Sequence, residues 1–143
     1  MQKKIEQTIV KAFFQKRVQD RMLYELASET KRDTAIGRLA HGFENVLKTE
    51  LMIEIKKPNS DPAALLNLLK KHGAGDSCYV IAWNPALDSK VLPLQVALET
   101  VVGNGQPVLI SCLHGKLSYF EAEQEIGPPP RFILKIEGGS ASK

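Results

Sequence analysis

The chain has 143 residues and a formal net charge of +3, with 24% charged and 43% hydrophobic residues. This size suits one globular domain with its own core, and this balance argues against long disorder, a fibrous repeat or a membrane protein. The longest apolar stretches, such as residues 91–98, fall far short of the roughly 20 residues that cross a bilayer. Charged residues follow the first Met closely, which argues against a secretory signal. We therefore expect a cytoplasmic location.

Residues that interrupt helices are distributed unevenly. All eight prolines lie between Pro58 and Pro130, and eight of the ten glycines follow His72. This distribution predicts helices in the first 57 residues and alternating helices and strands in the remainder. Basic charge is also uneven, because residues 1–57 carry 12 Lys and Arg against 8 Asp and Glu, whereas residues 58–143 carry 7 against 8.

The first predicted helix covers residues 3–27, where apolar residues recur at steps of three and four. Its apolar side turns by more than a quarter of a circle between residues 5–14 and 18–27, which one straight helix on one surface does not explain. The helix therefore kinks, or its halves pack on two surfaces, such as the core and a second chain. Adjacent Phe13 and Phe14 cannot face the same neighbour. Either both are covered within the monomer, or they form a protein interface with Arg17 and Arg21.

A second helix is predicted from Asp33 to about Glu50, which gives an αα-hairpin. One polar face of this helix carries Arg38, His41, Glu44 and Asn45. Such a set is either a solvated helix surface or a cluster for anion binding or acid–base chemistry. No metal site is expected, because His41 and Glu44 supply at most two ligands.

The basic residues of this block alternate with acidic ones, which is typical of a solvated helix surface. The residues concerned are Arg17, Arg21, Lys31, Arg32 and Arg38. A dense basic face with aromatic or amide side chains would favour nucleic acid instead. Weak nucleic-acid binding is therefore an alternative, and not the leading hypothesis.

The remainder of the chain predicts about five strands and two helices. The strands are expected over 51–55, 78–83, 108–113, 117–120 and 132–136, and the helices over 62–71 and 89–102. Asn59, Ser60 or Asp61 can cap the start of the first of these helices, with Pro62 in its first turn, and Gly73 suits its end. His114-Gly115 suggests a β-hairpin between the third and fourth strands.

This order predicts an α/β fold, in which the N-terminal αα-hairpin packs on a mixed sheet of order β-α-β-α-β-β-β. Helical connections favour a parallel centre with right-handed crossovers, and the hairpin adds an antiparallel edge. Residues 1–137 are expected to form a single domain, followed by a flexible tail over 138–143.

Parallel strands would bring their carboxyl ends to one edge of the sheet, where ligands of α/β proteins bind. The residues at those ends are Lys56, Lys57, Trp83, Asn84, Asp88 and His114. Lysines there would hold an anion, a Trp would stack and a His would transfer a proton. The alternative is structural, with these residues ending strands, capping a helix and forming a turn.

No motif identifies a reaction, and we expect no catalytic residues, cofactor or metal. Residues 103–105 lack the Lys and Ser or Thr of a phosphate loop. Cys78 and Cys112 lie in apolar runs, which predicts buried free thiols. The leading hypothesis is a non-catalytic protein-binding or regulatory module whose partner is another protein or a second copy, with no membrane contact. A small-ligand binder or enzyme at the strand ends is the alternative.

Overall fold

Helices make up most of the N-terminal part of the chain, as its lack of Pro and its low number of Gly predict. The structure is a computed structural model that describes residues 2–56, 61–124 and 129–136. Its helices are α1 (Gln2–Phe13), α2 (Gln19–Ala27), α3 (Arg32–Gly42), α4 (Pro62–Lys71) and α5 (Leu94–Val101). Short 3-10 turns are η1 (Lys16–Val18), η2 (Phe43–Asn45) and η3 (Thr49–Leu51). None of the helices in the described ranges is long and apolar enough to cross a membrane.

The predicted first helix is broken at Gln15, where φ is −59° and ψ is 140°. The backbone groups freed by this break are satisfied by the segment that follows α3. Gln15 N donates to the carbonyl of Val46 at 2.7 Å, and Lys48 N donates to the carbonyl of Phe13 at 2.8 Å. The break lets both halves turn their apolar sides to one core, which explains the shift of the apolar face. Phe13 and Phe14 are both fully buried within the chain.

Six strands form one sheet of order β1-β6-β5-β4-β2-β3. The strands are β1 (Met52–Glu54), β2 (Ser77–Ala82), β3 (Lys90–Pro93), β4 (Val108–Leu113), β5 (Leu117–Glu121) and β6 (Arg131–Lys135). Every neighbouring pair is antiparallel. The predicted hairpin of β4 and β5 is confirmed, and its turn includes Gly115, whose φ of +78° suits a residue without a Cβ.

The predicted parallel centre is wrong, and so is the count of about five strands. β2 and β4 pair antiparallel, with Tyr79 opposite Ser111 and Ala82 opposite Val108. The additional strand is β3, which the sequence suggested to be the start of a helix over 89–102. Because β3 folds back on β2 as a hairpin before α5 begins, β4 does not run beside β2 in the same direction.

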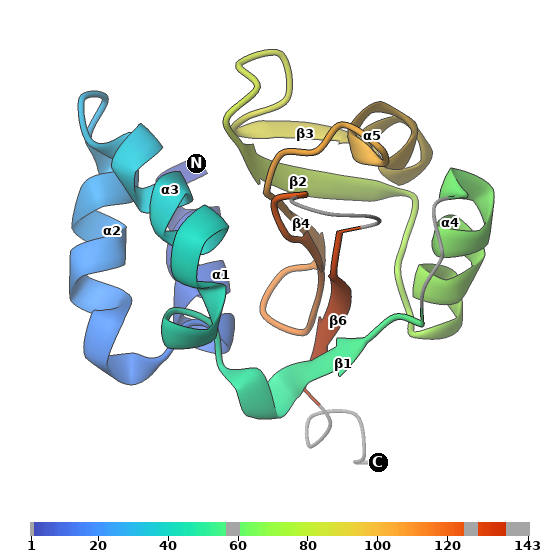
Figure 1. Ribbon diagram of the computed structural model, residues 1–143, viewed down its shortest axis with the longest axis horizontal. Coiled ribbons are helices and arrows are strands. Elements are labelled where there is room, and N and C mark those ends of the chain that lie inside the picture. Colours follow the sequence, from blue (N-terminus) through green and yellow to red (C-terminus); the bar gives the residue numbers. More distant parts are fainter. Residues whose placement is uncertain (1, 57–60, 125–128, 137–143) are drawn as a thin grey trace.

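Helices cover both faces of the sheet, which gives three layers (Figure 1). On one face, α1, α2 and α3 pack on alternate strand residues such as Tyr79, Leu109 and Phe120. On the other face, α4 and α5 pack on the residues between them, such as Val80 and Ile110. The mixed α/β class is therefore confirmed. The apolar runs of β2 and β4 reflect burial on both faces, which does not require parallel neighbours.

The helix α4 begins and ends as its sequence predicts. The Asp61 side chain accepts a hydrogen bond from Ala63 N at 3.1 Å, and Pro62 occupies the first helical position. Gly73, with φ of +108°, follows the C-terminal His72. The tail predicted over 138–143 lies outside the described residues.

Candidate functional site

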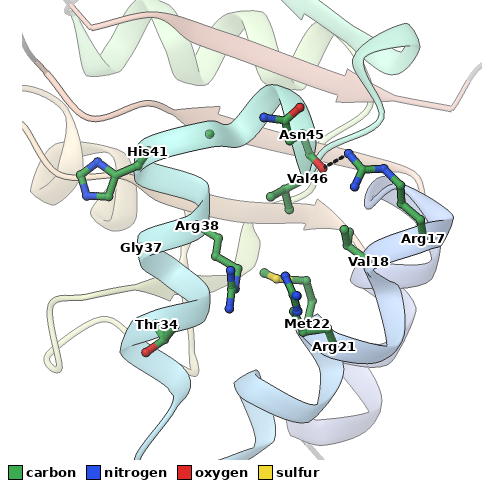
Figure 2. A pocket seen from close by; sticks show the side chains of 11 residues that line it. Arg17, Val18, Arg21, Met22, Thr34, Gly37, Arg38, His41, Asn45 and Val46 are labelled. Atoms are coloured by element: carbon green, nitrogen blue, oxygen red, sulfur yellow. Dashed lines mark hydrogen bonds between the residues drawn. The ribbon is translucent and has the colours of Figure 1, made fainter.

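A groove of about 530 Å³ lies between α2 and α3, in the layer formed by α1, α2 and α3, which we call the helical layer (Figure 2). Its rims carry the basic residues Arg17, Arg21, Arg38 and His41, and Val18, Met22 and Val46 lie between them. The groove therefore combines residues that the sequence suggested for two separate surfaces. Below, these four basic residues are called the basic rim.

The spacing of the basic rim follows from the helix repeat. Arg17 and Arg21 are four residues apart along η1 and α2, so they lie on one side of that helical segment. Arg38 and His41 are three residues apart on α3, and Asn45 follows one turn later in η2. The turn between α2 and α3 places the two helices side by side. Arg17 and Arg21 therefore face the polar residues of α3 across the groove.

Two glycines of α3 line the groove. Gly37 lies within the helix and Gly42 ends it. A Cβ at Gly37 would lie 3.7 Å from Cζ2 of Trp83, and one at Gly42 would lie 3.7 Å from Nδ2 of Asn45. Both are ordinary contact distances, so packing does not require a glycine at either position.

The three arginines of the basic rim use only some of their donors within the chain. Arg38 donates from Nε and Nη2 to the two carboxylate oxygens of Glu25, each at 2.9 Å. Arg17 donates from Nη2 to the carbonyl of Asn45 at 3.1 Å. Within the described part of the chain, Arg21 makes no hydrogen bond or ion pair with its side chain, which is exposed. The rim therefore keeps guanidinium donors available to a ligand.

Acidic residues next to the basic rim include Glu123, whose Oε1 is 3.5 Å from His41 Nδ1, and Glu25, of which 7% is exposed. The hydrogen bonds from Arg38 lower the pKa of Glu25 against the opposing effect of burial, and the charges of Arg38 and Arg21 lower it further. Glu25 is therefore a carboxylate at neutral pH. Its bidentate pairing shows that the guanidinium of Arg38 is oriented to bind a carboxylate at this place.

A fourth arginine, Arg32, lies in a different setting at the start of α3. Its five N–H groups are all bonded within the chain: they donate to both carboxylate oxygens of Glu6, to both of Asp88 and to the carbonyl of Leu26, at 2.6 to 2.9 Å. Tyr79 Oη donates to Glu6 Oε2 at 2.5 Å. We call these four side chains, Glu6, Arg32, Tyr79 and Asp88, the closed network.

The closed network ties α1, α3 and the sheet together. Burial lowers the pKa of the Arg32 guanidinium, but the hydrogen bonds with Glu6 and Asp88 outweigh burial and raise it. Burial and the hydrogen bond with Glu6 also raise the pKa of Tyr79. A hollow of about 440 Å³ borders Glu6 and Arg32. Every Arg32 donor is already bonded, so the closed network leaves no free guanidinium donor for a ligand. Its role is to stabilise the packing of α1 and α3 on the sheet.

The residues predicted at the strand ends do not come together. Since β2 and β4 are antiparallel, Trp83 and His114 follow opposite ends of the sheet. Trp83 Nε1 donates to the carbonyl of Asp33 at 3.2 Å, and His114 Nδ1 lies 2.8 Å from Ser111 Oγ. Asp88 belongs to the closed network.

Asn84 shares the loop after β2 with Trp83 and Asp88, and Asp88 N donates to its carbonyl at 2.9 Å, whereas Lys56 and His114 lie elsewhere. Asn84 Oδ1 accepts a hydrogen bond from Ala86 N at 2.9 Å within the loop after β2. Lys56 is exposed after β1, at the opposite edge of the sheet from β3. Lys57 lies outside the described residues. Glu44 is exposed and does not line the groove, so it does not join the other three polar residues of its predicted face.

Sequence reasoning missed Glu25, Gly37 and Gly42 as parts of this site. The two glycines carried a signal, because glycine inside a helical pattern costs stability and usually has a packing or functional reason. The use of arginine in place of lysine carried a second signal. The chain has 5 Arg and 14 Lys, and three of the five arginines line the groove while none of the lysines in the described ranges does.

Other chemistry-bearing groups are dispersed or buried. In the described ranges, no three His, Cys, Asp or Glu side chains lie close enough to hold a metal ion. Cys78 and Cys112 are buried and free, which confirms the prediction for both. Burial raises the pKa of Cys78 to about 11 and also raises that of Cys112, so neither is a thiolate at neutral pH.

Comparison with known proteins adds no family to this description. No protein-family model matches the chain, and no curated protein or solved structure is significantly similar to it.

Proposed function

We propose that this protein is a non-catalytic binding module that holds an acidic segment of a partner protein in the groove between α2 and α3. The observation that carries this proposal is the basic rim, in which three arginines with unused donors surround one groove. The volume of about 530 Å³ lies within the range of about 300 to 1,000 Å³ that is usual for ligand sites.

The use of arginine supports a carboxylate-bearing ligand. A guanidinium presents a planar fork of donors that matches a carboxylate at two points, whereas the lysine ammonium acts as a point charge. Glu25 already forms this two-point geometry with Arg38, a residue that lines the groove. A ligand carboxylate at Arg17 or Arg21 would repeat it.

The limited extent of the positive charge supports a short protein segment over nucleic acid. Exposed Asp20, Glu29 and Asp33 lie on the same helical layer as the basic rim. A nucleic-acid backbone presents continuous negative charge and would meet these carboxylates as well. A peptide segment with a few acidic side chains can place its charge at the rim alone.

The test measures fluorescence anisotropy of a labelled glutamate-rich decamer at low and at physiological salt. We expect binding that weakens with salt and falls about tenfold or more in Arg17→Met/Arg21→Met, because two charge-assisted contacts are lost. The matched control is Lys70→Met/Lys71→Met, which removes two positive charges from α4 on the other face of the sheet. We expect this control to bind like the wild type.

Three outcomes would overturn the proposal. One is the absence of binding at low salt, and another is equal loss of affinity in the groove variant and the α4 control. The third is tighter binding of a single-stranded oligonucleotide of the same charge, which would favour nucleic acid instead.

A further inference from the structure

We infer that the acidic segment carries a large apolar side chain between its acidic residues, and that this side chain enters the groove between the arginine rows. This inference rests on the proposed function and specifies the class of peptide that the groove accepts. Its basis is the surface between the charges, which is apolar.

The apolar surface has two sources. Half-buried Val18 supplies apolar surface on the Arg17 side of the groove, whereas Met22 and Val46, which also line the groove, are largely covered by the chain itself (Figure 2). The aliphatic stems of the arginines add to this surface, since only their guanidinium ends require water. As a result, the groove exposes more apolar than polar surface although its rim is basic.

Charge and shape together define the occupant. A chain of acidic residues alone would satisfy the basic rim and leave the apolar surface hydrated. An apolar side chain between the acidic residues would remove that surface from water, and the free energy gained grows with the apolar area buried. Gly37 and Gly42 line this space without contributing side chains to it.

The test compares two labelled peptides of equal length and charge, with glutamates on both sides of a central leucine in one and of a central serine in the other. We expect the leucine peptide to bind the wild type about tenfold more tightly or better, because burying a leucine contributes at least that factor. The matched variant is Val18→Ser, which leaves all charges in place. We expect the preference for leucine to shrink in this variant, while the serine peptide binds as before.

The outcomes separate this inference from the proposed function. Equal affinity of the two peptides for the wild type, or a preference for serine, would overturn the inference and leave binding of acidic segments intact. Binding of neither peptide would overturn the proposed function itself. If Val18→Ser does not fold, as judged by circular dichroism, the comparison on the wild type still decides.

Discussion

The helical layer contains two arginine environments that differ in how their donors are used. Arg32 has all five N–H groups bonded to groups of its own chain, and only 16% of its side chain is exposed. Arg17 and Arg21 are exposed, and within the described residues their side chains make a single hydrogen bond, from Arg17 to the carbonyl of Asn45. Both environments arise in the same stretch of sequence, so composition does not distinguish them. The two environments differ instead in the number of N–H donors that are already bonded within the chain.

This difference separates a stabilising role from a binding role. A buried cation must be paired, since an unpaired buried charge costs several kcal/mol. An exposed cation costs little when it is unpaired and contributes little to stability when it is paired. We therefore expect the closed network to control the free energy of unfolding and the basic rim to control affinity.

The largest effect is expected from Arg32→Met. This change leaves the carboxylates of Glu6 and Asp88 buried without their cation, so the free energy of unfolding should fall by about 3 to 5 kcal/mol. Urea unfolding monitored by circular dichroism measures this loss. The matched control is Arg21→Met, for which we expect a change within about 0.5 kcal/mol. Similar stability of the two variants would remove the distinction between the two environments.

A smaller effect is expected from Glu25→Gln, which frees the donors of Arg38 and removes a negative charge next to the groove. Affinity for the glutamate-rich decamer should rise about fivefold, which corresponds to about 1 kcal/mol. Anisotropy measures this change. Unaltered or weaker binding would show that Arg38 does not contact the ligand.

The same variant has an expected pH dependence. Because the folded-state pKa of Glu25 is lower than its ordinary value of 4.5, its ion pair stabilises the protein above that pH. This stabilisation is lost as the pH falls through the lower, folded-state pKa. The difference in unfolding free energy between wild type and Glu25→Gln should thus be present at pH 7 and shrink below pH 4.5. A difference that stays constant would contradict this.

The smallest effect is expected from Gly37→Ala. Alanine favours a helix over glycine by about 0.5 to 1 kcal/mol, and the added Cβ would meet Trp83 at an ordinary distance. We expect the midpoint of urea unfolding to rise accordingly. A loss of stability would mean that the backbone of α3 needs glycine here, although a Cβ would lie 3.7 Å from Trp83.

The sequence predicted the local structure of single elements better than it predicted how strands pair with one another in the sheet. The ends of α4 follow from Asp61, Pro62 and Gly73, because caps and left-handed residues act within a few positions. The hairpin of β4 and β5 follows from its short link. The direction of β2 relative to β4 did not follow, since an apolar run reports burial on both faces and says nothing of direction.

The site follows the same division. Spacing along the helix predicts a polar face that carries Arg38, His41 and Asn45. Arg17 and Arg21 are predicted separately, as part of a protein interface. That these two sets face one another, and that Arg32 does not join them, depends on contacts with residues such as Glu6 and Asp88, which are 26 and 56 positions away from Arg32.

What the sequence determined by itself is the helical first third, the apolar faces and the supply of arginine. These properties depend on the period of side chains along one element and on groups a few residues apart. Only the tertiary structure decided which arginine is enclosed and which remain open to a ligand. The reason is that burial and pairing are set by whichever distant carboxylates the packing of helices on the sheet brings within hydrogen-bonding distance.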